Sequence, residues 1–260
     1  AAQAGSGGIY LVDDNDITVG SVTGVQVQRV ASTGVAALYP APVDATLSGL
    51  STAAGGNIVI FTLNGTLTIS QPVAAGGAGN VLLQSRTSGL NDMDVLLNAS
   101  VASATGNISV IANRHVTQAV VGDIGTAGAG SVEVEAQNGT ITMMDDTADS
   151  ATAGTAGGNI RYKAAQNVLL GGLSAGAGDV SVTATAGSIS DNGDIATDVQ
   201  GDEVRLVAAV GIGSGSNHLE VAINKLAAQA AGGGIFIADN NLVAVDSIGQ
   251  VPAHRVQAGG

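Results

Sequence analysis

Apolar and polar residues alternate along this chain in short runs that recur every 20 to 28 residues. Each run begins with Gly and then Asn, Asp or Ser, and continues with alternating apolar positions. The clearest runs are GNIVIF (56–61), GNVLLQ (79–84), GNISVI (106–111), GSVEVE (130–135), GNIRYK (158–163) and GDVSVT (178–183). GGIYLV (7–12), DEVRLV (202–207) and GGIFIA (233–238) are looser examples. Strict alternation predicts β-strands with one buried face.

The alternation also predicts which side chains face the core. Inward positions are Val132, Val134, Val180 and Val182, and outward, solvent-facing positions are Glu133, Glu135, Ser181 and Thr183. Each run is followed by a turn, such as Asn64-Gly65 or Asn138-Gly139, and by a second short strand. This unit is too short for a closed β domain and too rich in strands for a helical solenoid. It matches one coil of a parallel β-helix.

A longer repeat contains these coils. Residues 227–260 match residues 1–34 at 15 of 34 positions without a gap, an offset of 227 − 1 = 226 residues. We therefore expect one long β-helical repeat over 1–226 and the start of the next repeat over 227–260. At about 24 residues per coil, the repeat would hold about nine or ten coils and rise about 45 Å at about 4.8 Å per coil.

Two segments interrupt the rhythm of the coils. Residues 35–56 contain Pro40 and Pro42, which resist pairing inside a sheet, and we expect this segment to be a loop that leaves the coil. Residues 217–231 place Leu219, Ile223 and Leu226 at helical spacing, although Leu219, Val221 and Ile223 also alternate as in a strand. The pattern leaves both alternatives open there.

The second position of the strand-starting motif is polar throughout. Asn57, Asn80, Asn107 and Asn159 occupy it in four coils, and Ser131 and Asp179 replace Asn in two others. Asn tolerates a left-handed backbone and hydrogen-bonds its neighbours, so these residues predict a structural Asn ladder along the helix axis. The functional alternative is a row of sugar-binding amides. The turn needs such a residue for its own sake, and this favours the ladder.

Composition and charge narrow the class of protein. The chain has 39 Gly residues, 2% aromatic residues, no Cys and a net charge of −13. Such a chain must bury many small side chains in thin layers, and its charge repels nucleic acid and anionic membrane surfaces. No apolar run is long enough for a membrane helix. We therefore expect an exported, extracellular protein that binds no nucleic acid and does not insert into a membrane.

Acidic clusters are the candidates for metal binding. They are Asp13-Asp14-Asn15-Asp16, Asp92-Met93-Asp94, Asp145-Asp146 and Asp191-Asn192-Gly193-Asp194. Crowded carboxylates suit a structural calcium ion, but Asp and Asn also cap their own turns without any metal. No twelve-residue EF-hand loop and no calcium-binding nonapeptide series is present. We expect no cofactor, with structural calcium as the alternative.

Enzymatic activity is not expected. A β-helix enzyme that cleaves acidic polysaccharides needs carboxylates beside Arg or Lys in a groove. The eight basic residues are scattered along the sequence, and Arg29 and Arg255 occupy the same position of the long repeat. The local carboxylate pairs that are candidates for glycoside hydrolysis are Asp145 with Asp146 and Asp191 with Asp194. Catalytic residues are therefore predicted to be absent.

The segments GDVSVTATAGSISDNGDI (178–195) and VRLVAAVGIGSGSNHLEVAINKLAAQAAGGGIFIADNN (204–241) resemble the β-strand repeats of giant bacterial surface proteins of the filamentous haemagglutinin type. The resemblance spans most of residues 56–250. It implies an exported, right-handed parallel β-helix that acts as an adhesin or a cell-surface fibre. It transfers no catalytic or binding residues, because the shared motif is structural.

We therefore predict a structural segment of an extracellular fibre, stalk or adhesin at the bacterial cell surface. Its expected partners are adjacent repeats or copies of itself joined end to end, and host or cell-surface glycans or proteins. The alternatives are a secreted β-helix enzyme that degrades polysaccharides and a self-associating sheath or surface-layer component.

Overall fold

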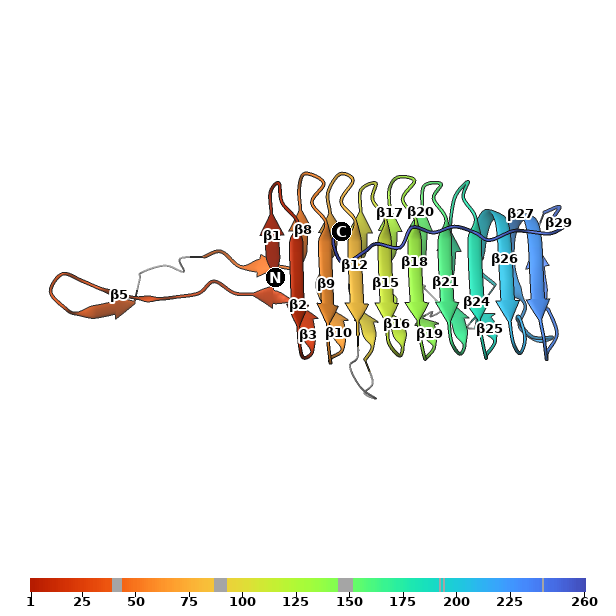
Figure 1. Cartoon of the computed structure of the whole chain (residues 1–260), viewed down its shortest axis with the longest axis horizontal. Helices are drawn as coiled ribbons and strands as arrows, with labels where there is room; N and C mark the ends of the chain where they lie inside the picture. The colour runs from red at the N-terminus through yellow and green to blue at the C-terminus, as the bar shows by residue number, and fades with distance from the viewer. Residues whose placement is uncertain (39–43, 87–92, 145–151, 192, 194, 240) are drawn as a thin grey trace.

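The protein is a long all-β rod, seen here in a computed structural model that describes residues 1–38, 44–86, 93–144, 152–191, 193, 195–239 and 241–260 (Figure 1). No described residue is helical. Parallel strands are stacked in sheets of 18 and 7 strands along the rod axis. The sequence-based prediction of a parallel β-solenoid is confirmed.

Each turn of the solenoid contributes one strand to each of three faces. The first face contains β2 (Ile9–Asp13), β9 (Ile58–Thr62), β12 (Val81–Ser85), β15 (Ile108–Ala112), β18 (Val132–Ala136), β21 (Ile160–Ala164) and β24 (Val180–Ala184). The second contains β3 (Ile17–Val19), β10 (Leu67–Ile69), β13 (Val95–Leu97), β16 (Val116–Gln118), β19 (Ile141–Met143), β22 (Val168–Leu170) and β25 (Ile189–Asp191). The third contains β1 (Ala2–Ala4), β8 (Leu50–Thr52), β11 (Val73–Ala75), β14 (Val101–Ser103), β17 (Ile124–Thr126), β20 (Thr152–Thr155) and β23 (Gly172–Ser174).

Longer strands lie at the C-terminal end of the rod. β26 (Val199–Ala208) and β27 (Leu219–Ala230) each run through both the third and the first face, and β28 (Ile237–Asp239) and β29 (Ala244–Val245) pair with β27. Residues 217–231, which the pattern left open between helix and strand, therefore contain a strand. Its two-residue alternation is satisfied because Leu219, Val221 and Ile223 all enter the core.

The core enclosed by the three faces is a column of mainly aliphatic side chains, which also contains the fully buried Tyr162. In β9, Ile58 and Ile60 are fully buried, and the in-register pairing with β12 stacks them on Val81 and Leu83. The inward positions predicted from the alternation, Val132, Val134, Val180 and Val182, all lie in this core. Thin layers of Val, Ile and Leu thus replace aromatic anchors, as the composition requires.

A column of glycines explains the first position of the motif. Gly56, Gly79, Gly106, Gly130, Gly158 and Gly178 stack on one another at one corner of the solenoid. A Cβ atom on any of the last five would collide with the carbonyl oxygen of the glycine one coil earlier. The column therefore requires Gly for close backbone approach, and not for positive φ, which is found at other glycines.

The polar residues of the motif form a neighbouring column. The side-chain oxygens of Asn57, Asn80 and Asn107 each accept a hydrogen bond from the backbone N–H of the next coil, at 2.8–2.9 Å. The side chain of Asn159 does the same for Asp179, at 2.9 Å. No described residue other than Gly has a positive φ, so these Asn residues do not use the left-handed backbone that Asn tolerates. Their role here is to accept hydrogen bonds between coils.

A hairpin leaves the rod at its N-terminal end. It consists of β4 (Ser21–Val22) paired with β7 (Leu47–Ser48), and β5 (Gln28–Val30) paired with β6 (Ala36–Leu38), both antiparallel. In Figure 1 it points along the axis, away from the other coils. The excursion predicted over 35–56 therefore begins earlier, and β8, inside that range, belongs to the stack. Pro40 and Pro42 lie outside the described residues.

The seven strands of the second face mark about seven turns, so the predicted nine or ten coils are not confirmed. The prediction divided the whole repeat by one coil length, whereas the hairpin uses chain without adding a coil. The right-handed sense of the solenoid stays a prediction. Within the described residues, no helix has the length and apolar character needed to cross a membrane.

Candidate functional site

The outward side of the first face carries the candidate site, which we call the outer face. In-register pairing arranges its side chains in two columns that run along the rod. One column contains Tyr10, Val59, Leu82, Ser109, Glu133, Arg161, Ser181 and Arg205, and the other contains Val12, Phe61, Gln84, Ile111, Glu135, Lys163, Thr183 and Val207. The outer face therefore changes from apolar to acidic to basic along the axis.

The C-terminal residues 246–260, here called the tail, lie along this outer face. The tail leaves the last coil and runs back over the strands towards the N-terminal end of the rod (Figure 1). Its final residues reach the first coils, where the hydroxyl of Tyr10 donates to the carbonyl of Gly259 at 3.4 Å. One extended segment thus covers strands from many coils.

Apolar and backbone contacts fix the register of the tail. Val256 is 6% exposed and packs on Val59, Leu82 and Ile111. The N–H of Val256 donates to the hydroxyl of Ser109 at 2.9 Å. Two further bonds connect the tail to the polar motif column: the N–H of His254 donates to Ser131 Oγ at 2.8 Å, and Asn159 Nδ2 donates to the carbonyl of Pro252 at 2.8 Å.

Arg255 anchors the tail electrostatically. Its guanidinium donates to both carboxylate oxygens of Glu133, at 2.8 and 2.7 Å, and to Glu135. The same carboxylates receive Arg161 at 2.7 Å and Lys163 at 3.2 Å from the neighbouring strand. These five side chains form the ion-pair cluster. Because three cations surround two carboxylates, no negative charge in the cluster is left without a partner.

The pKa values of the cluster follow from these contacts. Burial alone would raise the pKa of Glu135, but the hydrogen bonds and charges of Arg255 and Lys163 outweigh burial and leave that pKa below its ordinary value. Hydrogen bonds to Glu133 and Glu135 raise the pKa of Arg255 despite its partial burial. Both shifts favour the charged forms of Glu135 and Arg255 at neutral pH.

The outward glutamates correct a prediction. The alternation placed Glu133, Glu135, Ser181 and Thr183 in solvent, but the two glutamates are only 3% and 7% exposed and Ser181 is also buried. They do point out of the core, as period two requires. The side that should meet water is instead covered by the tail, and paired cations offset the cost of burying the carboxylates.

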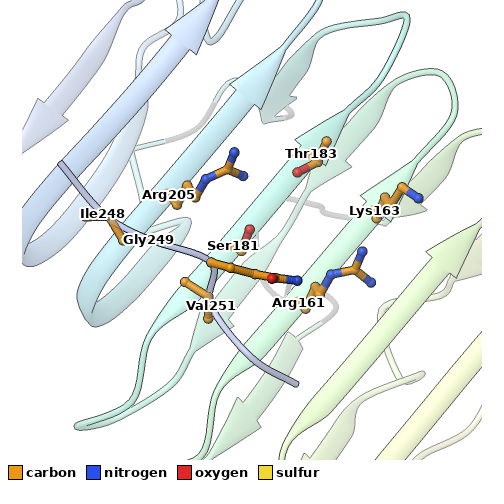
Figure 2. A pocket seen from close by; sticks show the side chains of 9 residues that line it. Arg161, Lys163, Ser181, Thr183, Arg205, Ile248, Gly249 and Val251 are labelled. Carbon is orange, nitrogen blue, oxygen red and sulfur yellow. The ribbon is translucent and has the colours of Figure 1, made fainter. Parts of the chain in front are cut away.

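Some of the basic residues gather in space. They are scattered in the sequence, yet Arg161, Lys163 and Arg205 lie together beneath the tail in a cavity of about 510 Å³ (Figure 2). The remaining lining residues are Ser181, Thr183, Ile248, Gly249, Gln250 and Val251. Such a cavity attracts anions. Its described lining has no carboxylate side chain, but Glu133 and Glu135 lie directly beside it, paired with Arg161 and Lys163.

The acidic clusters differ in what surrounds them. Asp13 accepts from the N–H of Asn15, Asp14 accepts from the Asn64 amide, and Asp16 accepts from the N–H of Thr66. These carboxylates cap turns. Asp94 accepts two hydrogen bonds from Arg114 and one from the N–H of His115. Asp92, Asp145, Asp146, Asn192 and Asp194 lie outside the described residues.

Asp191 belongs to the one carboxylate group among the described residues that could hold a metal ion. Its oxygens lie within 4.8 Å of those of Asp198 and Glu220, which come from later coils. Burial, followed by the charge of Asp191, raises the pKa of Glu220. The sequence pointed to Asp191, but Asp198 and Glu220 have no local acidic neighbours to mark them. Three oxygen donors are compatible with a structural calcium ion.

Comparisons of the chain with family models, with curated proteins and with solved structures find no match.

Proposed function

We propose that this chain is a structural segment of an extracellular fibre, stalk or adhesin at the bacterial cell surface, in which the solenoid is the rod. Its partners are adjacent repeats or copies of itself, joined end to end, and surface glycans or proteins presented to it. The mechanism is mechanical: stacked coils pair the backbone continuously and keep the rod stiff over its length.

The observation that carries this proposal is the uninterrupted parallel pairing of the first face together with the 226-residue recurrence of the sequence. In-register strands link β2 to β24 and continue into β26 and β27. Within the described part of the chain, β2 pairs on one side only, with β9. An unpaired strand edge favours the addition of another strand, and a repeating sequence supplies one of matching pattern.

The resemblance to filamentous haemagglutinin-type repeats supports the surface location and the adhesive role. The net charge of −13 and the absence of Cys are compatible with export and with solubility outside the cell. The cavity beneath the tail supports a role in binding an anionic ligand, such as an acidic glycan, because Arg205 and the three cations of the ion-pair cluster outnumber the two carboxylates there.

Electron microscopy of the native assembly tests the proposal. Seven coils at about 4.8 Å give an axial repeat of about 34 Å, and nine or ten coils give about 45 Å. A continuous thin fibre with an axial repeat in this range is the expected result. Discrete particles of single chains would contradict it, and cleavage assays on acidic polysaccharides would then be the next experiment.

A further inference from the structure

Positive charge gathers at one place on a chain whose net charge is −13. Four of the eight basic residues line the two adjoining cavities beneath the tail, namely Arg161, Lys163, Arg205 and Arg255. In the described linings of these cavities, the carboxylates are Glu133 and Glu135. This part of the outer face therefore carries a surplus of positive charge, against the sign of the chain as a whole.

Arg205 differs from the other three cations because it has no carboxylate of its own. The other three are bonded to the two glutamates of the ion-pair cluster. Among the described residues, none forms an ion pair or a hydrogen bond with the side chain of Arg205. Glu203, two positions earlier on the same strand, pairs with Lys225 instead. The N–H donors of the Arg205 guanidinium are therefore available to a ligand.

Hydroxyl groups and the tail complete the cavity around Arg205. In-register pairing places Ser181 between Arg161 and Arg205, and Thr183 lies on the same strand as Ser181 (Figure 2). Residues 248–251 of the tail line the cavity as well. The space of about 510 Å³ thus combines guanidinium and hydroxyl donors of the sheet with a cover that the tail supplies.

Donors of these kinds suit an oxyanion. A guanidinium presents its N–H groups as a planar fork, which matches the oxygen atoms of a carboxylate, sulfate or phosphate group. Serine and threonine hydroxyls can donate to the oxygens that the fork does not reach. A cation in a partly enclosed cavity also attracts an anion more strongly than a cation on an open surface, because the protein lowers the local dielectric constant.

We propose that this cavity binds one oxyanion group, with Arg205 as the principal contact, and that the bound group and the tail hold each other in place. The strip of the outer face that the tail covers is here called the seat. The inference deepens the proposed role in binding an anionic ligand and rests on it for the class of ligand. The oxyanion is free in solution or belongs to an acidic glycan, and the binding measurements separate these two sources.

The ligand and the tail are coupled because the tail covers the cavity. A ligand that contacts both the sheet and residues 248–251 binds the covered state more tightly than the uncovered state. By reciprocity, the ligand favours the seated tail by the same factor by which the seated tail tightens ligand binding. Val256 holds the tail against Val59, Leu82 and Ile111, which lie several strands away from Arg205. The hold of the tail and the contact with the ligand can therefore be changed separately.

Titration calorimetry on the full chain at constant ionic strength measures the binding. The probes are sodium sulfate, as a free oxyanion, and a galacturonate trisaccharide, which carries its carboxylates on a glycan. Maltotriose is the matched neutral control. We expect saturable binding of an anionic probe and no binding of maltotriose. Tighter binding of the trisaccharide than of sulfate identifies a glycan acid as the ligand, and the reverse order identifies a free oxyanion.

Substitution of Arg205 tests its role as the principal contact. Arg205→Gln should weaken binding of the anion at least tenfold, and it breaks no ion pair found among the described residues. Arg29→Gln is the matched control because it removes the same charge from the hairpin, at the opposite end of the rod (Figure 1). It should change binding less than twofold. Circular dichroism checks that both variants keep the β fold.

A second variant tests the coupling to the tail. Val256→Ser loosens the tail without altering the charge of the chain, and it should weaken binding of the anion at least threefold. In the unaltered chain, the bound anion should slow hydrogen–deuterium exchange over residues 248–256. The same concentration of anion should leave this exchange unchanged in the Arg205→Gln variant.

Three results would overturn the proposal. The first is the absence of saturable binding by both anions, which would also remove the anionic-ligand role. The second is equal affinity of Arg205→Gln and the unaltered chain, which would keep that role but move it away from this cavity. The third is binding that changes neither with Val256→Ser nor with the exchange of the tail, since ligand and tail would then be independent. None of these results concerns how copies of the chain join, so microscopy tests the fibre separately.

Discussion

The first and last segments of this chain share a sequence pattern but differ in what they contact. Residues 20–34 form one limb of a projecting hairpin whose valines are exposed, whereas residues 246–260 lie on the outer face with Val251 and Val256 buried. The two segments leave the rod at different places. The hairpin is inserted between β3 of the second face and β8 of the third face, whereas the tail follows β29 and lies on the outer side of the first face.

The comparison teaches that the outward side of a solenoid face can be as specific as its core. Core positions repeat coil after coil with interchangeable aliphatic residues. The outer face instead has a unique order of apolar, acidic and basic residues, and this order defines one register for an Arg-Val element. Specific contact along a repetitive rod needs such a non-repeating face.

The largest expected effect comes from reversing the charge of the anchoring arginine. Arg255→Glu places a third carboxylate beside Glu133 and Glu135. The substitution removes the ion pairs of these two glutamates with the tail and adds charge repulsion. We therefore expect it to destabilise the bound state of the tail by about 2–3 kcal/mol. Hydrogen–deuterium exchange at the amides of His254 and Val256 measures the release, because both donate to side chains of the sheet.

Arg29→Glu is the matched control, since it alters the same repeat position in the hairpin. We expect it to leave exchange at these two amides unchanged, because the amides of His254 and Val256 bond to the outer face and not to the hairpin. Equal protection of the tail in both variants would show that Arg255 does not hold it.

A smaller effect should follow acidification. The pKa of Glu135 is lowered in the folded protein from 4.5, so its contribution to tail seating is fully present above about pH 4.5 and is lost as pH falls through the folded pKa. A fluorophore at Ala258→Cys should therefore gain mobility at acid pH before the strands of the core unfold. Fluorescence anisotropy together with circular dichroism separates the two transitions.

The same fluorophore at Ser32→Cys provides the comparison, because position 32 is the hairpin equivalent of position 258. Its anisotropy should show no step in this pH range while the core stays folded. A step at both positions would mean that acid loosens the whole molecule and that the glutamates of the outer face are not the cause.

Much of the fold was predictable from the sequence because its causes are local and repeated. Period-two alternation predicted the strands and the inward side chains, and the Gly-Asn spacing predicted the solenoid. The recurrence of Gly indicated the glycine column, which is required because a Cβ atom there would collide with the backbone of the preceding coil. The boundaries of the hairpin were less accessible, since the prolines pointed only to its distal part.

The site was largely hidden because its contacts are remote in sequence. Arg255 and Glu135 are 120 residues apart in the sequence. The alternation correctly predicted that the Glu135 side chain points out of the core, but it could not predict that the tail would cover this side chain. One signal did exist: Arg29 and Arg255 share a repeat position. The pattern could not reveal that one copy would be seated on the sheet and the other would project.

The most direct test of the central claim is a disulfide across the seat in a chain that has no Cys of its own. Ser109→Cys with Val256→Cys joins two positions already linked by a hydrogen bond from the Val256 N–H, at 2.9 Å. Under mild oxidation at low protein concentration, mass spectrometry should find an intramolecular disulfide in this pair and none in Ser109→Cys with Val30→Cys. Equal cross-linking of both pairs, or of neither, would contradict the account.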